Sequence, residues 1–186
     1  MLILKSASPR RQQILKDLRL QFRVEPSQVD EDVRVGEPPL SYLKRVTIAK
    51  LELEKAKSEE IYISSDTIVV LDEQILGKPT DFAEGMEILS CLSGKIHSVY
   101  SGLGILTKGE VLFDYDETRV EFKPWGKEEI AVYLNECKPY DKAGSYGIQD
   151  EKSPVLRFTG SYSNVLGFPL RKFYQHFSIW KEFLSQ

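Results

Sequence analysis

The first fifteen residues place a short apolar strand directly before a helix. Leu2-Ile-Leu4 is apolar throughout, and Ser8-Pro9 then has the composition of a helix start. A serine at the N-cap accepts a hydrogen bond from an otherwise unpaired amide, and proline suits the first helical position, where no N–H is needed. We therefore expect a strand over residues 2–4 and a helix that begins at Ser8, which together indicate an α/β protein.

The start of this helix gathers groups that favour an anion. Ser6, Ser8, Arg10 and Arg11 surround its positive end, where free amides and guanidinium groups attract phosphate. The alternative is a capped helix whose arginines lie in solvent. Ile14, Leu15 and Leu18 form the apolar stripe of the helix under either interpretation.

Composition limits the classes of protein that fit. With 186 residues, 41% of them hydrophobic, the chain is long enough for a single domain over residues 1–186. A net charge of −3 disfavours nucleic acid as a stable partner. Cys91 and Cys137 lack zinc-site spacing, and no segment resembles a signal peptide or is long enough to cross a membrane. We expect a cytoplasmic protein, with Cys91 as a small core residue.

The order of apolar patterns predicts a mixed β-sheet flanked by helices. Expected strands cover residues 2–4, 21–24, 61–71, 74–76, 97–106 and 111–122. Expected helices cover residues 8–18, 41–57, 81–93 and 127–136, and a final helix follows Pro169 and packs Phe173, Phe177, Trp180 and Phe183 on the body. Residues 140–149 mix small, charged and aromatic side chains without a period, which is typical of loops that shape sites.

Two charged residues stand where apolar ones are expected. Asp66 interrupts the apolar strand of residues 61–71, and Lys50 shares a helix face with Leu43, Val46 and Leu53. A buried carboxylate must be paired, bound to metal or protonated. The ordinary interpretations are an aspartate satisfied within the core and a lysine whose stem covers apolar surface while its ammonium reaches solvent.

Glu31 and Lys78 complete a set of acids and bases suited to phosphoryl chemistry. Glu31 comes from an acidic loop and Lys78 follows a hairpin, so each could also be an ordinary surface charge. Cations neutralise a polyphosphate, while carboxylates hold Mg²⁺ or orient the attacking water. The sequence lacks both a P-loop and a G-x-S-x-G motif.

Taken in order, the motifs of this chain resemble those of the Maf (septum formation protein) family of nucleotide pyrophosphatases. The resemblance spans nearly the whole chain. Its motifs are Ser6-Ala-Ser-Pro-Arg-Arg11, Asp30-Glu31, Ala49-Lys50, Ser65-Asp-Thr-Ile-Val69, Leu76-Gly-Lys-Pro79, Leu92-Ser-Gly-Lys95 with His97, Asp141-Lys-Ala-Gly-Ser-Tyr-Gly-Ile-Gln149 and Asn164-Val-Leu-Gly-Phe-Pro-Leu170.

The resemblance implies the Maf/Ham1 fold, which is related to inosine triphosphate pyrophosphatases: an elongated mixed sheet, flanking helices and a cleft between two lobes. It also implies cleavage of a nucleoside triphosphate to the monophosphate and pyrophosphate with Mg²⁺ or Mn²⁺, and it is compatible with a homodimer. Asp66 resembles the proton acceptor that activates water, and Glu31 a catalytic or metal-organising carboxylate, so these two are the expected metal ligands. The residues that resemble phosphate-handling positions are Ser6, Arg10, Arg11, Lys50 and Lys78.

Substrate choice follows from the same resemblance. Arg10, Thr67 and Gln149 resemble the positions that set base preference, and Thr67 with Gln149 indicates the branch that acts on dTTP and UTP. An amide such as that of Gln149 can donate and accept hydrogen bonds together, which suits a pyrimidine edge. Two departures are Lys5, where the family usually has alanine, and Asp150, where glycine is common.

Two alternatives remain on sequence grounds. One is a non-enzymatic regulator of cell division, which would have no need for Glu31, Lys50 and Asp66 to converge. The other is a related pyrophosphatase that prefers purines such as inosine, xanthosine or 7-methylguanosine triphosphates.

Overall fold

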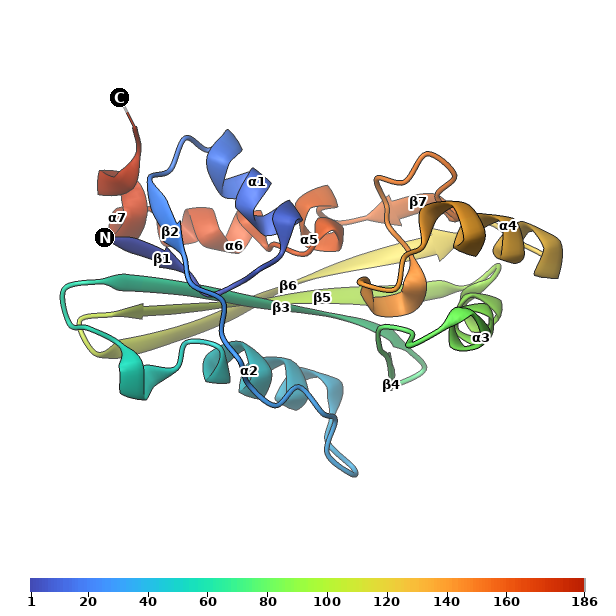
Figure 1. Ribbon diagram of the computed structural model, residues 1–186, viewed down its shortest axis with the longest axis horizontal. Coiled ribbons are helices and arrows are strands. Elements are labelled where there is room, and N and C mark those ends of the chain that lie inside the picture. Colours follow the sequence, from blue (N-terminus) through green and yellow to red (C-terminus); the bar gives the residue numbers. More distant parts are fainter. Residues whose placement is uncertain (186) are drawn as a thin grey trace. The chain divides into compact units, whose positions relative to one another are not determined.

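A mixed β-sheet organises the chain in the computed structural model, which describes residues 1–185 (Figure 1). Its long strands are β3 (Ile61–Leu71), β5 (Ile96–Thr107) and β6 (Glu110–Phe122). Among the described residues the short strands are β1 (Leu2–Leu4), β2 (Phe22–Val24), β4 (Gln74–Leu76) and β7 (Val155–Thr159). The strand order is β2-β1-β3-β5-β6-β7, with β4 paired to β3. Because β1 is parallel to β2 and β3 while β4 and β7 are antiparallel to their partners, the predicted mixed sheet is confirmed.

The described residues divide into two compact units. Unit 1 consists of Met1–Asp66, Ser101–Asp116 and the segment from Gly167 onward, and unit 2 consists of Thr67–Tyr100 and Glu117–Leu166. The helices of unit 1 are α1 (Pro9–Asp17), α2 (Pro39–Ala49), α6 (Leu170–Gln175) and α7 (Phe177–Trp180), with short 3-10 turns at Leu53–Lys55 and Lys181–Phe183. Those of unit 2 are α3 (Phe82–Leu92), α4 (Lys127–Cys137) and α5 (Tyr162–Leu166), with a 3-10 turn at Ala143–Ser145.

Unit 1 has helices on both faces of its part of the sheet. In Figure 1, α1, α6 and α7 lie on one side of the strands and α2 lies on the other. Leu15 of α1, Phe173 of α6 and Trp180 of α7 are buried together against apolar residues of β1, β3 and β5. Phe173 and Trp180 stack with ring centroids 4.4 Å apart, so the aromatic residues of the C-terminal segment close this core.

Two glycines of β5 allow α2 to approach the sheet closely. A Cβ on Gly102 would lie 2.4 Å from the Thr47 hydroxyl of α2, and a Cβ on Gly104 would lie 2.4 Å from the Ser64 hydroxyl of β3. The Ser64 hydroxyl in turn donates to the Thr47 carbonyl at 2.6 Å. Since glycines two residues apart face the same side of a strand, this pair creates the space in which α2 lies.

Unit 2 has its own core between α3, α4 and the strands. Leu89 of α3, Leu134 of α4, and Val120 and Phe122 of β6 are buried in one apolar cluster. Beside them, the buried His97 ring contacts Phe122 edge-on, at 4.8 Å between centroids, and its Nε2 lies 2.8 Å from the Tyr146 hydroxyl.

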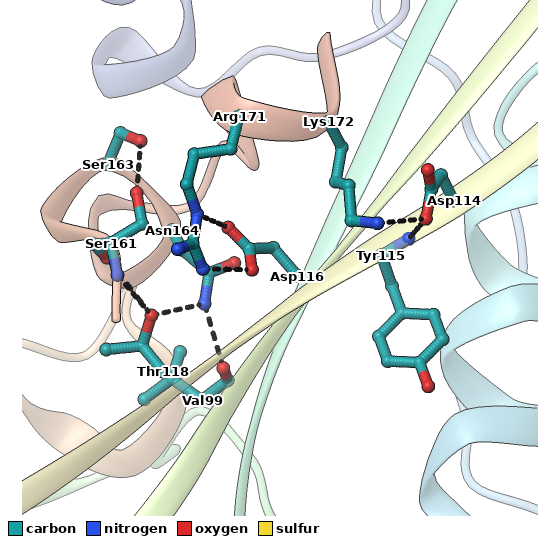
Figure 2. Close-up of polar contacts among 10 residues, drawn as sticks. All are labelled: Val99, Asp114, Tyr115, Asp116, Thr118, Ser161, Ser163, Asn164, Arg171 and Lys172. Atoms are coloured by element: carbon teal, nitrogen blue, oxygen red, sulfur yellow. Dashed lines mark hydrogen bonds and ion pairs between the residues drawn. The ribbon is translucent and has the colours of Figure 1, made fainter. Parts of the chain in front are cut away.

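Polar contacts fix the chain after β7 in each unit (Figure 2). In unit 2 the buried Asn164 side chain donates to the Val99 carbonyl at 2.9 Å and to the Thr118 hydroxyl at 3.0 Å. In unit 1 the Arg171 guanidinium donates twice to the Asp116 carboxylate, at 2.9 and 2.6 Å. A longer, partly exposed ion pair joins Lys172 to Asp114 at 3.1 Å (Figure 2).

Several sequence predictions are wrong in detail. The helix expected to reach residue 57 ends at Ala49, because Leu51 turns into the core and Glu52 adopts a left-handed conformation with φ 49°. Leu53 is consequently exposed. The final helix is broken at His176, which leaves Phe177 exposed, while Phe173 and Trp180 are buried as predicted.

Other differences concern one expected core residue and two elements. Cys91 is exposed rather than part of the core, because α3 buries the stripe formed by Gly85, Ile88, Leu89 and Leu92. Strand β7 and helix α5 were not predicted. Over the described residues, no helix is both long and apolar enough to span a bilayer.

Candidate active site

Lys50 joins the two carboxylates that the sequence singled out. Its ammonium Nζ lies 2.6 Å from Oδ1 of Asp66 and 2.9 Å from Oε1 of Glu31. The side chains of Lys50 and Asp66 are each 9% exposed, whereas that of Glu31 is 41% exposed. The interpretation of Lys50 as a lysine that extends to solvent is therefore wrong, since its buried ammonium lies between the buried Asp66 and the partly exposed Glu31. Three segments that are distant in sequence meet at this ammonium.

Local structure explains how Lys50 and Asp66 meet. Lys50 follows the last residue of α2, where a cation also interacts favourably with the helix dipole. Asp66 lies within β3 two residues after Ser64, whose hydroxyl donates to the α2 backbone. The close approach of α2 allowed by the β5 glycines thus brings the lysine to the strand that carries the aspartate.

The predicted helix start is confirmed, and it directs Arg11 toward a second set of polar groups. The Ser8 hydroxyl accepts from the Arg11 amide at 3.5 Å, and α1 begins at Pro9. Nη1 of Arg11 donates to the Ser6 hydroxyl at 3.1 Å, and Nε donates to the Gly167 carbonyl at 2.7 Å. The Ser6 hydroxyl also accepts from the Ser8 amide at 3.2 Å. Ser6 and Arg11 are therefore held together at the N-terminus of α1, as the sequence suggested.

Electrostatics link this arginine to the acidic groups. Burial lowers the pKa of the Arg11 guanidinium, the neighbouring charge of Arg10 adds to this effect, and the carboxylates of Asp66 and Glu31 oppose it. Arg10, Arg11 and Lys50 supply three positive charges against the two negative charges of the carboxylates. This cluster in unit 1, which we call the charged cluster, therefore carries a net positive charge suited to an anionic ligand.

The remaining predicted site residues lie in unit 2. Thr67 is half-buried and follows Asp66 in β3, whereas Lys78 and Gln149 are exposed. The Gly144 amide donates to the Gly77 carbonyl at 2.9 Å, which joins the segment that carries Lys78 to the segment that carries Gln149. These two segments are thus neighbours within unit 2.

Gln149 occupies a turn that Tyr133 of α4 holds in place. The Asp150 amide donates to the Gly147 carbonyl at 3.3 Å and closes the turn. The Tyr133 hydroxyl accepts from the Gly147 amide at 2.9 Å and donates to Oδ2 of Asp150 at 2.5 Å. Asp150, the departure from the family pattern, is therefore bound by a tyrosine, and the burial of that tyrosine raises its pKa.

Sequence reasoning missed two contributors to the charged cluster. The Gly167 carbonyl accepts from both Arg11 and the Ser65 hydroxyl, the latter at 3.2 Å, and so ties α1 to β3. No sequence signal identifies a backbone carbonyl as the hydrogen-bond acceptor of a particular side chain. The second contributor is the pair Gly102 and Gly104 of β5. The sequence does carry a signal for this pair, because alternate glycines in an apolar strand, as in Ser101-Gly-Leu-Gly104, indicate close approach of another backbone.

A charged cluster with a net positive charge, built on a mixed α/β sheet, has the chemistry of a protein that handles phosphorylated ligands. Comparison with known proteins gives the particular family: residues 1–179 match the family described as Maf-like protein. The chain therefore belongs to the Maf-like protein family, and the resemblance drawn from its motifs is confirmed.

Curated relatives cover nearly the whole chain. The dTTP/UTP pyrophosphatase of Leptospira interrogans serogroup Icterohaemorrhagiae serovar Lai (strain 56601) is 48% identical over 185 residues, covering 100% of this chain and 98% of that protein. The dTTP/UTP pyrophosphatase of Thermosipho africanus (strain TCF52B) is 41% identical, covering 92% of this chain and 88% of that protein. The solved structure of the Staphylococcus aureus Ham1 protein is similar with a TM-score of 0.46 and 10% identity, covering 66% of this chain and 72% of that one.

Proposed function

We propose that this protein hydrolyses dTTP and UTP to the nucleoside monophosphate and pyrophosphate, through a single Maf-like domain over residues 1–186. The names of relatives at 38–48% identity support the reaction and the substrates. The observation that carries the proposal is the bridge of Lys50 between Glu31 and Asp66 beside the Arg11 guanidinium. A regulator without enzymatic activity has no need for this combination of acids and bases.

In this proposal Asp66 accepts a proton from the water that attacks the α-phosphorus. Its side chain is 9% exposed and is oriented by the Lys50 ammonium at 2.6 Å, so the carboxylate is held in one position. A positioned general base typically contributes about 10²- to 10⁴-fold to the rate. Lys50 also stabilises the negative charge that develops on the phosphate oxygens.

Ser6, Arg10, Arg11 and Lys78 bind the triphosphate in this proposal. The hydrogen bonds of Arg11 to Ser6 and Gly167 fix the guanidinium before substrate arrives. A preorganised donor costs little reorganisation in the reaction, so it stabilises the transition state more than a mobile one.

The donor set of the charged cluster fits a divalent cation as a partner of the substrate. Within residues 1–185 no group of three or more His, Cys, Asp or Glu side chains could hold a metal ion. Mg²⁺ is commonly bound by one or two carboxylates together with waters and substrate phosphates, and Glu31 with Asp66 provides such a pair. Bound there, Mg²⁺ or Mn²⁺ would neutralise charge on the phosphates.

Base recognition is assigned to Thr67, Gln149 and Arg10. The turn that carries Gln149 is closed by its backbone and held by Tyr133, which supports this assignment by fixing the main chain next to the exposed amide. A side-chain amide can donate a hydrogen bond to a carbonyl of the pyrimidine base and accept one from the imide N–H of that base.

Release of pyrophosphate from a panel of nucleoside triphosphates with Mg²⁺ or Mn²⁺ tests the proposal. We expect dTTP and UTP to give the highest kcat/KM. A preference for inosine, xanthosine or 7-methylguanosine triphosphate would replace the pyrimidine assignment, and no turnover with any nucleotide would favour the regulator of cell division.

We further propose a cytoplasmic location, which suits the free Cys91 and Cys137, and a homodimer, which light scattering would test.

A further inference from the structure

The segment that carries Glu31 has no regular secondary structure to hold it. Residues 25–38 connect β2 to α2 without helix or strand, and Val33 and Val35 are exposed. Holding one backbone conformation in such a segment costs entropy at every residue, so specific contacts must supply the order. The position of the Glu31 carboxylate at 2.9 Å from Lys50 depends on those contacts.

Two side chains of α2 bind consecutive carbonyls of this segment. The Tyr42 hydroxyl donates to the Glu31 carbonyl at 2.8 Å, and Nη2 of Arg45 donates to the Asp32 carbonyl at 2.8 Å. Tyr42 and Arg45 also contact each other, with the guanidinium carbon 5.4 Å from the centre of the tyrosine ring. The two peptide groups that flank Asp32 are thus fixed to a rigid helix.

Arg45 secures the far end of the same segment. Its Nε and Nη2 donate to the two oxygens of Glu37, both at 2.7 Å, and this bidentate pair lowers the pKa of Glu37 to about 2. Burial, together with the charges of Asp66 and Glu31, raises the pKa of Tyr42, so its hydroxyl remains a donor across the neutral range. Both donors are therefore present whenever the enzyme would work.

We propose that Tyr42 and Arg45 are positioning residues of the reaction, which hold the Glu31 carboxylate against Lys50 by binding the main-chain carbonyls of Glu31 and Asp32. The inference rests on the proposed function. Neither side chain needs to touch the substrate, so their loss lowers kcat more than it raises KM. Because they act through Glu31, their loss has no further effect once the Glu31 carboxylate is absent.

The test compares Tyr42→Phe with a matched control, Tyr62→Phe. Tyr62 is also buried in unit 1, and its hydroxyl donates to Glu60 at 2.7 Å and accepts from the Lys57 amide at 3.0 Å, away from the charged cluster. For dTTP hydrolysis we expect Tyr42→Phe to lower kcat by roughly tenfold, in line with the loss of one hydrogen bond, with KM changed less than about twofold. We expect Tyr62→Phe to keep kcat within about twofold of the unmodified protein.

A double-mutant cycle separates positioning from general loss of structure. In the Glu31→Gln background, Tyr42→Phe should change kcat by less than about twofold. An equal tenfold loss in both backgrounds, or an unchanged kcat in Tyr42→Phe alone, overturns the assignment. Arg45→Lys keeps the charge but loses the bidentate geometry, so it should repeat the Tyr42→Phe pattern, and a wild-type kcat in that variant removes Arg45 from the assignment.

Hydrogen exchange of the full chain gives a readout that needs no turnover. Amides of residues 31–37 should exchange faster in Tyr42→Phe and Arg45→Lys than in the unmodified protein or in Tyr62→Phe. Unchanged exchange in both variants overturns the positioning claim even if the unmodified protein releases pyrophosphate. Absence of pyrophosphate release from the unmodified protein overturns the proposed function instead, so the two failures are distinguishable.

Discussion

Replacing Lys50 with methionine should lower the free energy of unfolding, independently of any effect on catalysis. The Lys50 ammonium contacts both the Asp66 carboxylate and the Glu31 carboxylate, at 2.6 and 2.9 Å. Methionine fills a similar volume without charge, so the substitution leaves Asp66 buried without its cation. The effect therefore reports the electrostatic part of the interaction rather than a cavity.

The size of the effect follows from distance and burial. At 2.6 Å and an effective dielectric constant of about 20, the Coulomb attraction is roughly 6 kcal/mol, which the desolvation of both groups partly offsets. Removal of one partner of a buried pair typically costs about 3–5 kcal/mol. For a chain of this length each kcal/mol lowers Tm by about 2–4 °C, so a decrease of roughly 10 °C is expected.

Thermal and urea unfolding of three variants give the measurement. Lys172→Met is the control, because its pair with Asp114 is 29% exposed on each side and should contribute less than about 1 kcal/mol. The double variant Lys50→Met with Asp66→Asn should be more stable than Lys50→Met alone, since it removes the uncompensated charge. A stability of Lys50→Met equal to that of the control, or no recovery in the double variant, would refute the reasoning.

Three further outcomes are expected. Asp66→Asn should retain the fold by circular dichroism but lose at least about 100-fold in kcat with Mg²⁺, and full activity would remove Asp66 from the mechanism. Thr67→Gln should change the ratio of kcat/KM between dTTP and other triphosphates before it changes Tm, whereas an unchanged substrate ranking counts against its place in base recognition. Burial lowers the pKa of His97 from 6.5 to about 4, so the unfolded chain binds a proton there that the folded chain does not. Stability should therefore be complete above about pH 6.5 and decrease by up to roughly 3 kcal/mol toward pH 4, and a pH profile of urea unfolding that stays equally steep in His97→Phe would argue against this.

Local signals predicted the parts of the fold that depend on local structure. Ser8 and Pro9 begin α1 as expected because a cap and a first-turn proline act within four residues. Asp81 caps α3 by accepting from the Glu84 amide at 2.9 Å, and Gly94 adopts the left-handed conformation expected after that helix. The turn at Lys108-Gly109 has positive φ at both residues, as a tight hairpin requires.

Tertiary contacts decided the parts that the sequence could not predict. The end of α2 is fixed by Glu52, whose carboxylate leaves the helix path to bind the buried Lys5 ammonium at 2.6 Å. Helix propensity alone favours continuation through Leu53, because no breaker residue precedes it. Strand β7 could not be predicted from apolar periodicity. Its position depends on pairing with β6, and its apolar residues Leu156 and Phe158 are exposed rather than buried on one face.

The charged cluster was partly predictable. Asp66 in an apolar strand and Lys50 on an apolar helix face each indicated a special role, since a buried charge needs a partner. The 2.6 Å contact between them could not be predicted, because it depends on how closely α2 approaches the sheet over Gly102 and Gly104.

Hydrolysis of dTTP in ¹⁸O-labelled water tests the central claim most directly. If the acids and bases gathered at Lys50 direct water to the α-phosphorus, the label enters thymidine monophosphate and the pyrophosphate stays unlabelled. Label in the pyrophosphate, or release of orthophosphate in its place, would show attack at another phosphorus and contradict the account.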